Sequence, residues 1–476
     1  MKQTVGLLAL LTAAALAVLS CKKGTETTGI SPHANTELQQ KIDAIGQRYV
    51  DGGKVLGLSI AVLRENDTLY AGGFGFTDTA RTRAVNNNTN FLLASISKLV
   101  GTAMVMKLAE EGKLSLEQSL YELLPDYPDV EQAKKLKLRH LVSHTSGLPE
   151  YASVVDSIYV KTRIPPTKEQ IYQILTENPP MFEPGEHYSY NNSGFYLMGL
   201  IIEHVTGRSF QSEMDRIINA PTGLHFKLIG EAVHEPEMSP LYELHGNRMV
   251  PEPHWTWIKG DGGMTTTALE LANFPLMWSD GAIISDSSYQ QMITPTLLND
   301  GLETGYGLGV FTGIFEGHPV LGHSGGHKTL KSKMMFFPDQ RLSIVVMVNT
   351  DNTPANANRI FGEVALAALD LKIPDYSAVN EVIPEPNRYE GSYQEEAVKE
   401  HNTVEITYNT EDSHLYYGFA GSGGRPEKMH HLGDGEFWVE DWPLDRIYFV
   451  YGEDGRILAL REYYTGYYTH LRKKAD

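Results

Sequence analysis

Cysteine is nearly absent from this sequence: its 476 residues include one, Cys21. A single cysteine cannot form an intramolecular disulfide, so packing and hydrogen bonds must hold the fold together. Positive charge is also scarce, because 40 Lys and Arg residues stand against 59 Asp and Glu residues, for a formal net charge of -19. An acidic surface repels nucleic-acid phosphates, so no nucleic-acid partner is expected.

Long apolar runs are confined to the N-terminal stretch MKQTVGLLALLTAAALAVLSC. A Lys near its start, a Leu- and Ala-rich run and small residues before the Cys are typical of a secretory signal, and the run is too short and wrongly flanked for a durable membrane span. The Cys directly after AVLS resembles the lipobox of bacterial lipoproteins, in which cleavage leaves a diacylated N-terminal Cys. An ordinary secretory signal with an incidental thiol is the alternative.

We therefore predict a signal peptide over residues 1–20, a lipid anchor on Cys21 and a flexible tether over residues 21–36. The expected location is the periplasmic or surface face of a bacterial cell-envelope membrane, with the anchor as the membrane contact. The membrane leaflet and the oligomeric state stay open.

The chain after the tether separates into two parts by pattern. β-type runs over 56–76, 305–315, 331–339 and 342–350 bracket a middle in which helical patterns and loops dominate. This predicts an α/β (α+β) domain over residues 37–372, with an antiparallel sheet, flanking terminal helices and an inserted helical subdomain. A cleft between sheet and insertion is the natural place for a site.

A second domain is predicted at the C-terminus. A Pro-bearing polar stretch over residues 373–386 indicates a linker, and alternating apolar residues indicate a small antiparallel β domain over residues 387–476. This domain is rich in tyrosine. Its aromatic residues could form a binding face, but filling the core of a small barrel or sheet is the better expectation.

One short pattern raises the question of nucleophilic chemistry. FLLASISKLVGTAMVMKLAEEGKLSL places Ser95 three residues before Lys98, at the predicted start of an amphipathic helix. Residues three apart on a helix share a face, with Cβ atoms about 5–6 Å apart. An amine there loses hydration, which lowers its pKa, and it can then accept the serine proton. Alone the pair is weak evidence, since this spacing arises by chance and is usually a solvated surface pair.

Two further motifs supply partners for this pair. FEPGEHYSYNNSGFYLMG contains Tyr190 and Asn192, a phenol that can relay protons and an amide that can bind a carbonyl or an amine. An interface aromatic and a helix cap are the alternatives for these two. VLGHSGGHKTL contains His323 before Ser324 and Gly325, where a histidine can donate to a carboxylate or polarise a hydroxyl, and paired glycines allow close approach of a ligand.

In this order and at these separations the three motifs resemble those of the serine β-lactamase and penicillin-binding-protein superfamily, in its class C β-lactamase and D-alanyl-D-alanine carboxypeptidase branch. The stretches LKLRHLVSHTSGLPEY, GDGGMTTTALELANF and YGLGVF are also similar, and the resemblance covers roughly residues 37–372. It implies a β-lactamase/transpeptidase-like fold and a serine hydrolase that acts on an ester, an amide or a D-amino-acid peptide.

The resemblance also implies roles for the motif residues. Ser95 would attack a carbonyl and become acylated, and Lys98 and Tyr190 would move protons, with Tyr190 assisting the leaving group and activating the deacylating water. Asn192 would hold the substrate amide. No metal or organic cofactor is implied.

At the third motif, His323 would support a substrate carboxylate or Tyr190, and Gly325 would belong to the substrate-binding strand. The backbone N–H groups of Ser95 and Gly326 would form the oxyanion hole. His-Ser-Gly stands where class C β-lactamases carry Lys-Thr-Gly. A neutral imidazole grips a carboxylate less firmly than an ammonium does, which puts efficient β-lactam turnover in doubt.

Other functions were weighed against this one. RHLVSHTSG spaces His140 and His144 as two metal ligands on a helix would be, but the glutamate of His-Glu-x-x-His is missing, so a metalloenzyme is rejected. GDGG is expected to skirt the cleft. A catalytically weak, lipid-anchored sensor of peptidoglycan or β-lactams is the alternative function, although its signature would be loss of a motif residue, and all are present.

Overall fold

The computed structural model of the chain describes residues 36–53, 55–245, 248–252, 255–327, 330–350, 357–372, 382–394, 403–421, 425–440, 444–452, 454–464 and 467–474. The predicted signal peptide, Cys21 and nearly all of the predicted tether lie outside these residues, as does most of the predicted linker. Among the helices within them, none is both long enough and apolar enough to cross a bilayer.

A six-stranded antiparallel sheet forms the centre of the larger domain, in the order β2-β1-β11-β10-β9-β8. Its strands are β1 Gly57–Arg64, β2 Asp67–Gly75, β8 Phe311–Phe315, β9 His318–His327, β10 Leu330–Phe337 and β11 Leu342–Val348. β1 pairs with β2 on one side and with β11 on the other, so the two ends of the domain meet in one sheet. The predicted antiparallel sheet is confirmed.

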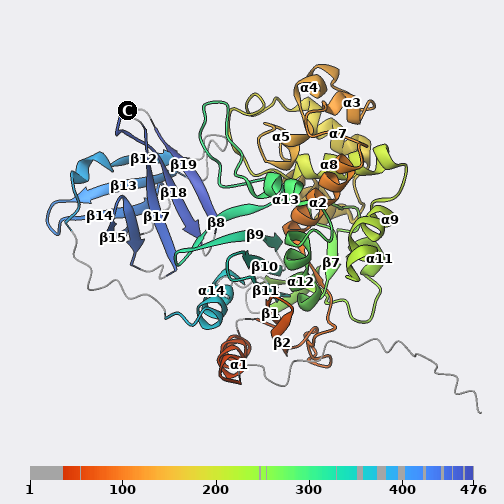
Figure 1. The fold of residues 1–476 in the computed structure, drawn as a ribbon, viewed down its shortest axis with the longest axis horizontal. Helices are drawn as coiled ribbons and strands as arrows, with labels where there is room; N and C mark the ends of the chain where they lie inside the picture. The colour runs from red at the N-terminus through yellow and green to blue at the C-terminus, as the bar shows by residue number, and fades with distance from the viewer. Residues whose placement is uncertain are drawn as a thin grey trace, which may run out of the picture.

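Two terminal helices, α1 Thr36–Asp51 and α14 Ala357–Ala368, cover one face of this sheet (Figure 1). Alternation along β1 explains how both faces are buried: Ile60 packs with the terminal helices, whereas Ala61 packs with the core on the opposite face. The predicted flanking helices are therefore confirmed, and the sheet is the middle layer of the domain.

The helical insertion covers the other face. Its helices are η1 Ala94–Ile96, α2 Ser97–Glu110, α3 Leu120–Leu123, α4 Val130–Lys135, α5 Leu138–Val142, α6 Ala152–Thr162, α7 Lys168–Glu177, α8 Asn192–Thr206, α9 Phe210–Met214, η2 Asp215–Asn219, α10 Ala220–Thr222, α11 Ile229–Ala232, α12 Ala268–Ser279 and α13 Asp286–Ile293. Its short strands are β3 Phe91–Leu92, β4 Lys227–Leu228, β5 Leu241–His245, β6 Arg248–Glu252 and β7 Met264–Thr266. The insertion and the sheet share one large core.

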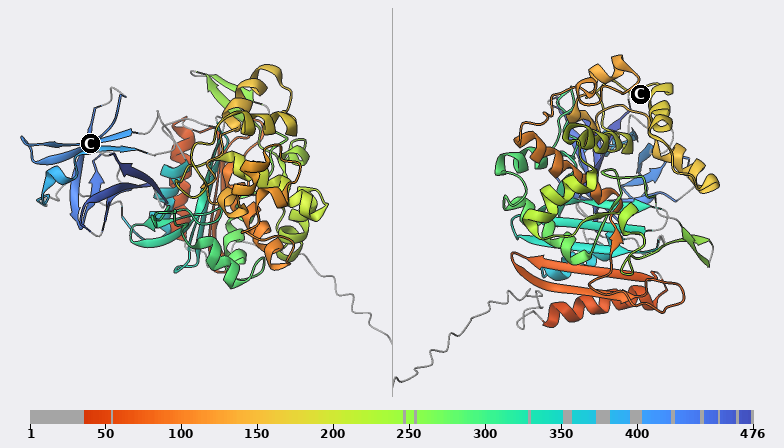
Figure 2. Two further views of the ribbon diagram at one scale, coloured as in Figure 1. Left: turned by 90° about the horizontal axis from the view of Figure 1, so that it is seen from above. Right: turned by 90° about the vertical axis from the view of Figure 1, so that its right-hand side faces the viewer.

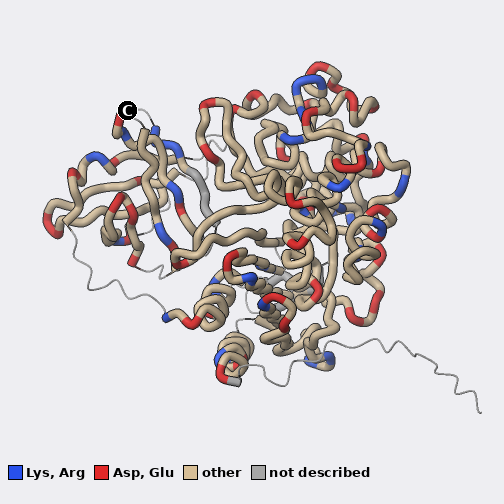
Figure 3. Tube along the Cα trace, in the orientation of Figure 1, with Lys and Arg blue, Asp and Glu red and all other residues tan. Residues whose placement is uncertain are grey.

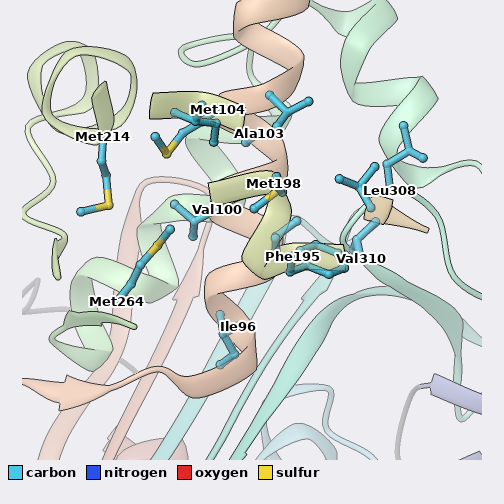
Figure 4. Close-up of a cluster of buried hydrophobic side chains, with 14 of the residues drawn as sticks. Ile96, Val100, Ala103, Met104, Phe195, Met198, Met214, Met264, Leu308 and Val310 are labelled. Atoms are coloured by element: carbon cyan, nitrogen blue, oxygen red, sulfur yellow. The ribbon is translucent and has the colours of Figure 1, made fainter. Parts of the chain in front are cut away.

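Helix α2 lies inside this core, and the expectation that it is amphipathic is wrong. All of its residues from Ser97 to Met106 are buried, together with Leu108, so polar and apolar positions face protein alike. Figure 4 shows Val100 and Met104 of α2 beside Phe195 and Met198 of α8. A helix enclosed on all sides has no solvent-facing stripe, and this enclosure is what buries Lys98.

The C-terminal part is a closed eight-stranded antiparallel barrel, which follows the short helix η4 Pro386–Arg388. Its strands are β12 Gly391–Gln394, β13 Thr403–Asn409, β14 His414–Phe419, β15 Glu427–Gly433, β16 Glu436–Val439, β17 Asp445–Tyr451, β18 Ile457–Tyr464 and β19 Tyr467–Lys473. Tyr393, Tyr417 and Phe437 are buried inside it, so these aromatic residues fill its core as expected. Phe419, two residues after Tyr417 on β14, is 44% exposed.

The barrel lies at one side of the larger domain (Figure 2). Its strand β19 contacts the edge strand β8, beside which it is labelled in Figure 1. Three ion pairs between side chains of the described residues join them: Arg446 Nη2 lies 3.0 Å from Glu316 Oε1, Arg472 Nη2 lies 2.6 Å from Asp300 Oδ2, and Arg461 Nη2 lies 3.7 Å from Glu303 Oε1. Glu316 belongs to the turn between β8 and β9. Acidic and basic residues are interspersed along both parts (Figure 3).

Candidate active site

The candidate nucleophile Ser95 lies in η1, between β3 and the buried helix α2. The preceding residue, Ala94, has a φ of 47°, in the left-handed region that residues with a Cβ seldom adopt. Leu93 anchors this turn by donating its N–H to the carbonyl of Met264 on β7. Backbone strain of this kind is kept where the surroundings impose it, most often at functional sites. Here it presents a half-buried serine at the wall of a cavity.

Lys98 is fully buried directly behind Ser95. Its Nζ donates hydrogen bonds to Ser95 Oγ at 3.0 Å, to Asn192 Oδ1 at 2.7 Å and to the carbonyl oxygen of Asp261 at 2.6 Å. Burial lowers the pKa of Lys98 to about 8, and this effect outweighs the negative charges of Asp261 and Glu150, which raise the pKa. The predicted serine–lysine pair is thus brought into contact, and the lysine is partly neutral at moderately alkaline pH.

The second motif reaches this pair from the start of α8. Asn191 caps the helix by accepting a hydrogen bond from the N–H of Gly194, so the cap is the residue before Asn192. Asn192 bridges two charged groups, because its Oδ1 accepts from Lys98 and its N–H donates to Glu150 Oε2 at 2.7 Å. The ring of Tyr190 lies with its centroid 5.1 Å from Lys98 Nζ, which puts the phenol beside the ammonium.

His144, whose spacing from His140 is that of a metal-ligand pair, contacts the second motif. Its ring centroid lies 4.2 Å from that of Tyr190, and its Nδ1 accepts the N–H of Asn191 at 2.9 Å. Its φ of 61° again lies in the left-handed region. No three His, Cys, Asp or Glu residues come together as a metal-ion site in the part of the chain that the structure describes. His144 therefore supports the loop that carries Tyr190.

The third motif lies within β9, and its His323 is buried and is not among the residues that line the cavity. Its Nδ1 lies 2.6 Å from the carbonyl oxygen of Ser324, which can only accept, so the proton is on Nδ1. Its Nε2 then accepts from the Tyr306 hydroxyl, 3.0 Å away. Burial, together with the charge of Lys98, lowers the pKa of His323 to about 3, so the imidazole is neutral. Its centroid lies 6.1 Å from that of Tyr190.

The two glycines after Ser324 have different surroundings. A Cβ on Gly325 would lie 2.0 Å from the carbonyl oxygen of Leu93 and 2.2 Å from Ser332 Oγ. Only glycine lets β9 approach the segment before the nucleophile this closely. The close approach expected at this motif is therefore made by the chain itself at Gly325, whereas Gly326 lines the cavity with Ser95. The oxyanion hole formed by their N–H groups stays a prediction.

Sequence reasoning missed two acidic residues that complete the site. Glu150 accepts hydrogen bonds from the N–H groups of Asn192 and Ala152, both 2.7 Å, and burial raises its pKa. Asp261 is 5% exposed, and its carboxylate accepts from the Tyr151 hydroxyl and from the N–H of Lys259. Their signal was present in the family-like stretches: Glu150 ends SGLPE, and Asp261 belongs to GDGG, which does border the cavity.

The cavity in front of Ser95 has a volume of about 240 Å³. Its lining combines the motif residues with a largely apolar remainder. The residues are Leu92, Ala94, Ser95, Tyr151, Ala152, Tyr190, Asn192, Leu241, Trp255, Ile258, Asp261, Gly262, Gly326 and His327. The cavity thus brings a serine with a buried amine base next to a phenol, an amide and a glycine backbone, which is an arrangement for acyl transfer.

The chain is similar to proteins of known family. The family model described as Beta-lactamase matches residues 42–369. Penicillin-binding protein 4* of Bacillus subtilis (strain 168) is 26% identical over 409 residues, which cover 81% of this chain and 87% of that protein. The region that the family model matches contains all three motifs.

Solved structures show the same fold. The octameric penicillin-binding protein homologue from Pyrococcus abyssi superposes with a TM-score of 0.64 at 22% identity, covering 91% of this chain and 99% of that one. D-amino acid amidase from Ochrobactrum anthropi SV3 superposes with a TM-score of 0.61 at 20% identity, covering 70% of this chain and 99% of that one.

Proposed function

This chain belongs to the Beta-lactamase family of serine hydrolases, and from that premise we propose that it hydrolyses an ester, an amide or a D-amino-acid peptide through an acyl-enzyme on Ser95. One observation carries the proposal: the ammonium of Lys98 is fully buried, has a pKa lowered to about 8, and lies 3.0 Å from Ser95 Oγ. A serine oxygen becomes a strong nucleophile when a neutral amine is in place to take its proton.

In the proposed acylation step, Ser95 Oγ attacks the substrate carbonyl carbon while its proton passes to neutral Lys98. The N–H groups of Ser95 and Gly326 stabilise the developing oxyanion. The bond to the leaving amine or alcohol then breaks, and that group takes a proton relayed from Lys98 through Tyr190. The product is an ester of Ser95.

In deacylation, water attacks this ester and gives a proton to the Tyr190–Lys98 pair. The proton returns to Ser95 Oγ as the carboxylic acid leaves, so the enzyme is restored. Asn192 is proposed to offer its amide to the substrate. His323, neutral and not among the residues that line the cavity, is proposed to support Tyr190 rather than to bind a substrate carboxylate.

We further propose that the protein is exported and held at a cell-envelope membrane by a lipid on Cys21. The N-terminal sequence alone supports this. Mass spectrometry of the protein from a bacterial envelope tests it: a diacylated N-terminal Cys21 is expected, and an unmodified thiol in the mature protein would contradict it.

The test of the proposed function is intact-mass spectrometry after incubation with benzylpenicillin and, separately, with p-nitrophenyl acetate, followed by turnover assays. A Ser95-dependent acyl adduct or Ser95-dependent hydrolysis is expected, and Ser95→Ala should show neither. A long-lived adduct without turnover of any substrate would favour the sensor instead. Activity that survives in Ser95→Ala would overturn the mechanism.

A further inference from the structure

Apart from the catalytic groups, most of the residues that line the cavity are apolar. They include Leu92 of β3, Leu241 of β5, and Trp255 and Ile258 of the loop after β6. Leu92, Leu241 and Ile258 are buried even though they border a cavity, so their exposed surface is small and faces inward. A pocket of this composition gains free energy by excluding water from an apolar group of the substrate.

Trp255 is held in position by other rings. Its ring stacks on Trp257, with centroids 5.2 Å apart and planes at 18°, and meets His327 of β9 edge-on at 5.1 Å. Trp257 in turn contacts Tyr159 of α6 at 4.5 Å. This aromatic row joins α6 to the strand of the third motif, so Trp255 forms a pre-organised wall rather than a mobile side chain.

Charge in the cavity is unfavourable for an anionic substrate group. None of the described residues that line it is Lys or Arg, and the acidic residue Asp261 is among them. Lys98 donates to three protein oxygens. Lys331 lies on the face of β9 toward which a Cβ on Gly326 would project. Because side chains alternate along a strand, this is the opposite face from the one on which Gly325 packs against the nucleophile segment.

We infer that the cavity binds an uncharged, bulky apolar group, aromatic or branched, next to the scissile carbonyl, and that Trp255 and Leu241 set this specificity. The inference rests on the proposed function. It excludes substrates that carry a carboxylate at this position.

The experiment uses the full-length protein in detergent with the S-methyl thioesters of acetic, phenylacetic and succinic acids. The leaving thiol is the same and too small to fill the cavity, so differences report the acyl group. The kcat/KM for the phenylacetyl thioester is expected to be at least about 10-fold above that for the acetyl thioester. The kcat/KM for the anionic succinyl thioester should be below that for the acetyl thioester.

Variants of Trp255 and Leu241 test whether these residues cause the preference for the phenylacetyl group. Trp255→Ala and Leu241→Ala should each reduce the phenylacetyl-to-acetyl ratio several-fold, and Trp255→Phe, which keeps an aromatic face, should restore most of it. Leu297→Ala is the matched control, because Leu297 is 63% exposed and lies outside the cavity lining. Melting temperatures show which variants remain folded.

The outcomes separate the inference from the function. A wild-type ratio near one, with Ser95-dependent turnover of all three thioesters, would overturn the inference and leave the hydrolase intact. A preference for the succinyl thioester would also overturn it and point to Lys331 as the cation. No Ser95-dependent turnover of any thioester, and no penicillin adduct, would overturn both.

Discussion

Burial of Lys98 makes stability and activity depend on pH in the same range. Its pKa is about 8 in the folded protein against an ordinary value of 10.5. Between these values the unfolded chain binds a proton that the folded protein has released, so the free energy of unfolding rises with pH. Replacement by Met keeps a long apolar side chain and removes the titration, so the perturbation is Lys98→Met.

The size of the effect follows from the two pKa values. From about pH 7 to about pH 9.5, Lys98 is expected to add about 2 kcal/mol to the wild-type free energy of unfolding relative to Lys98→Met. Buried tyrosines set the upper limit of the useful range. Burial raises the pKa of groups such as Tyr70 in the folded state, so the unfolded chain loses protons first above about pH 10 and stability falls again.

The assay is urea unfolding at several pH values, paired with the pH dependence of kcat/KM. Activity should rise through an apparent pKa of about 8, because the neutral amine is the base. The kcat/KM of Lys98→Met should be at least about 100-fold below that of the wild type. Lys333 is the internal control: it is fully buried on β10, burial lowers its pKa to about 7, and its side of the sheet faces α14.

Lys333→Met should therefore change the pH dependence of stability in the same direction, by about 3 kcal/mol over the same range, without moving the pH profile of activity. Two results would refute the reasoning about Lys98. One is a stability difference between wild type and Lys98→Met that stays constant from pH 7 to 9.5. The other is a kcat/KM that is flat through pH 8.

Three further predictions follow from contacts. Gly325→Ala should destabilise the protein by about 1–3 kcal/mol and lower its activity, because the new Cβ would lie 2.0 Å from a backbone oxygen. In Gly326→Ala the new Cβ meets only the end of a lysine side chain at 3.3 Å, so this variant should keep wild-type stability in thermal unfolding. Arg446→Met should cost about 1–3 kcal/mol by leaving the partly buried carboxylate of Glu316 without its partner, and adding Glu316→Gln should recover most of it in a double-mutant cycle. His144→Asn removes the ring that packs on Tyr190, so kcat should fall about 10-fold. Asparagine tolerates the positive φ and can still accept the N–H of Asn191, so KM and the melting temperature should change little.

Much of the architecture could be predicted because periodicity reports burial. The runs that became β1 and β11 are almost wholly buried, and the alternation in β13 follows the barrel interior. Helix α2 shows the limit of this reasoning. Its composition is that of a core helix, and the pattern does not reveal how many neighbours enclose it, so one polar face was expected where there is none.

The motif residues were predictable, whereas their supports were not. Ser95, Lys98 and Asn192 occur in short patterns, and the structure joins them by hydrogen bonds. The Glu150 carboxylate accepts from the backbone N–H of Asn192, and Asp261 meets Lys98 through its own backbone carbonyl. Both residues stand in the family-like stretches, but their spacing from the motif residues does not predict these contacts. Long-range packing determines which backbone atoms they meet.

The properties of the site depend on how closely separate chain segments approach. Gly309 has a φ of 73°, and a Cβ there would lie 2.2 Å from Thr102 Oγ1 and 2.9 Å from the carbonyl oxygen of Lys98. Gly325 allows a similar approach of β9 to the segment before Ser95. Because glycine admits these contacts, the chain excludes water from around Lys98, and loss of hydration lowers the pKa of the amine. The basicity of the proposed catalytic base is therefore set by small residues far from it in sequence.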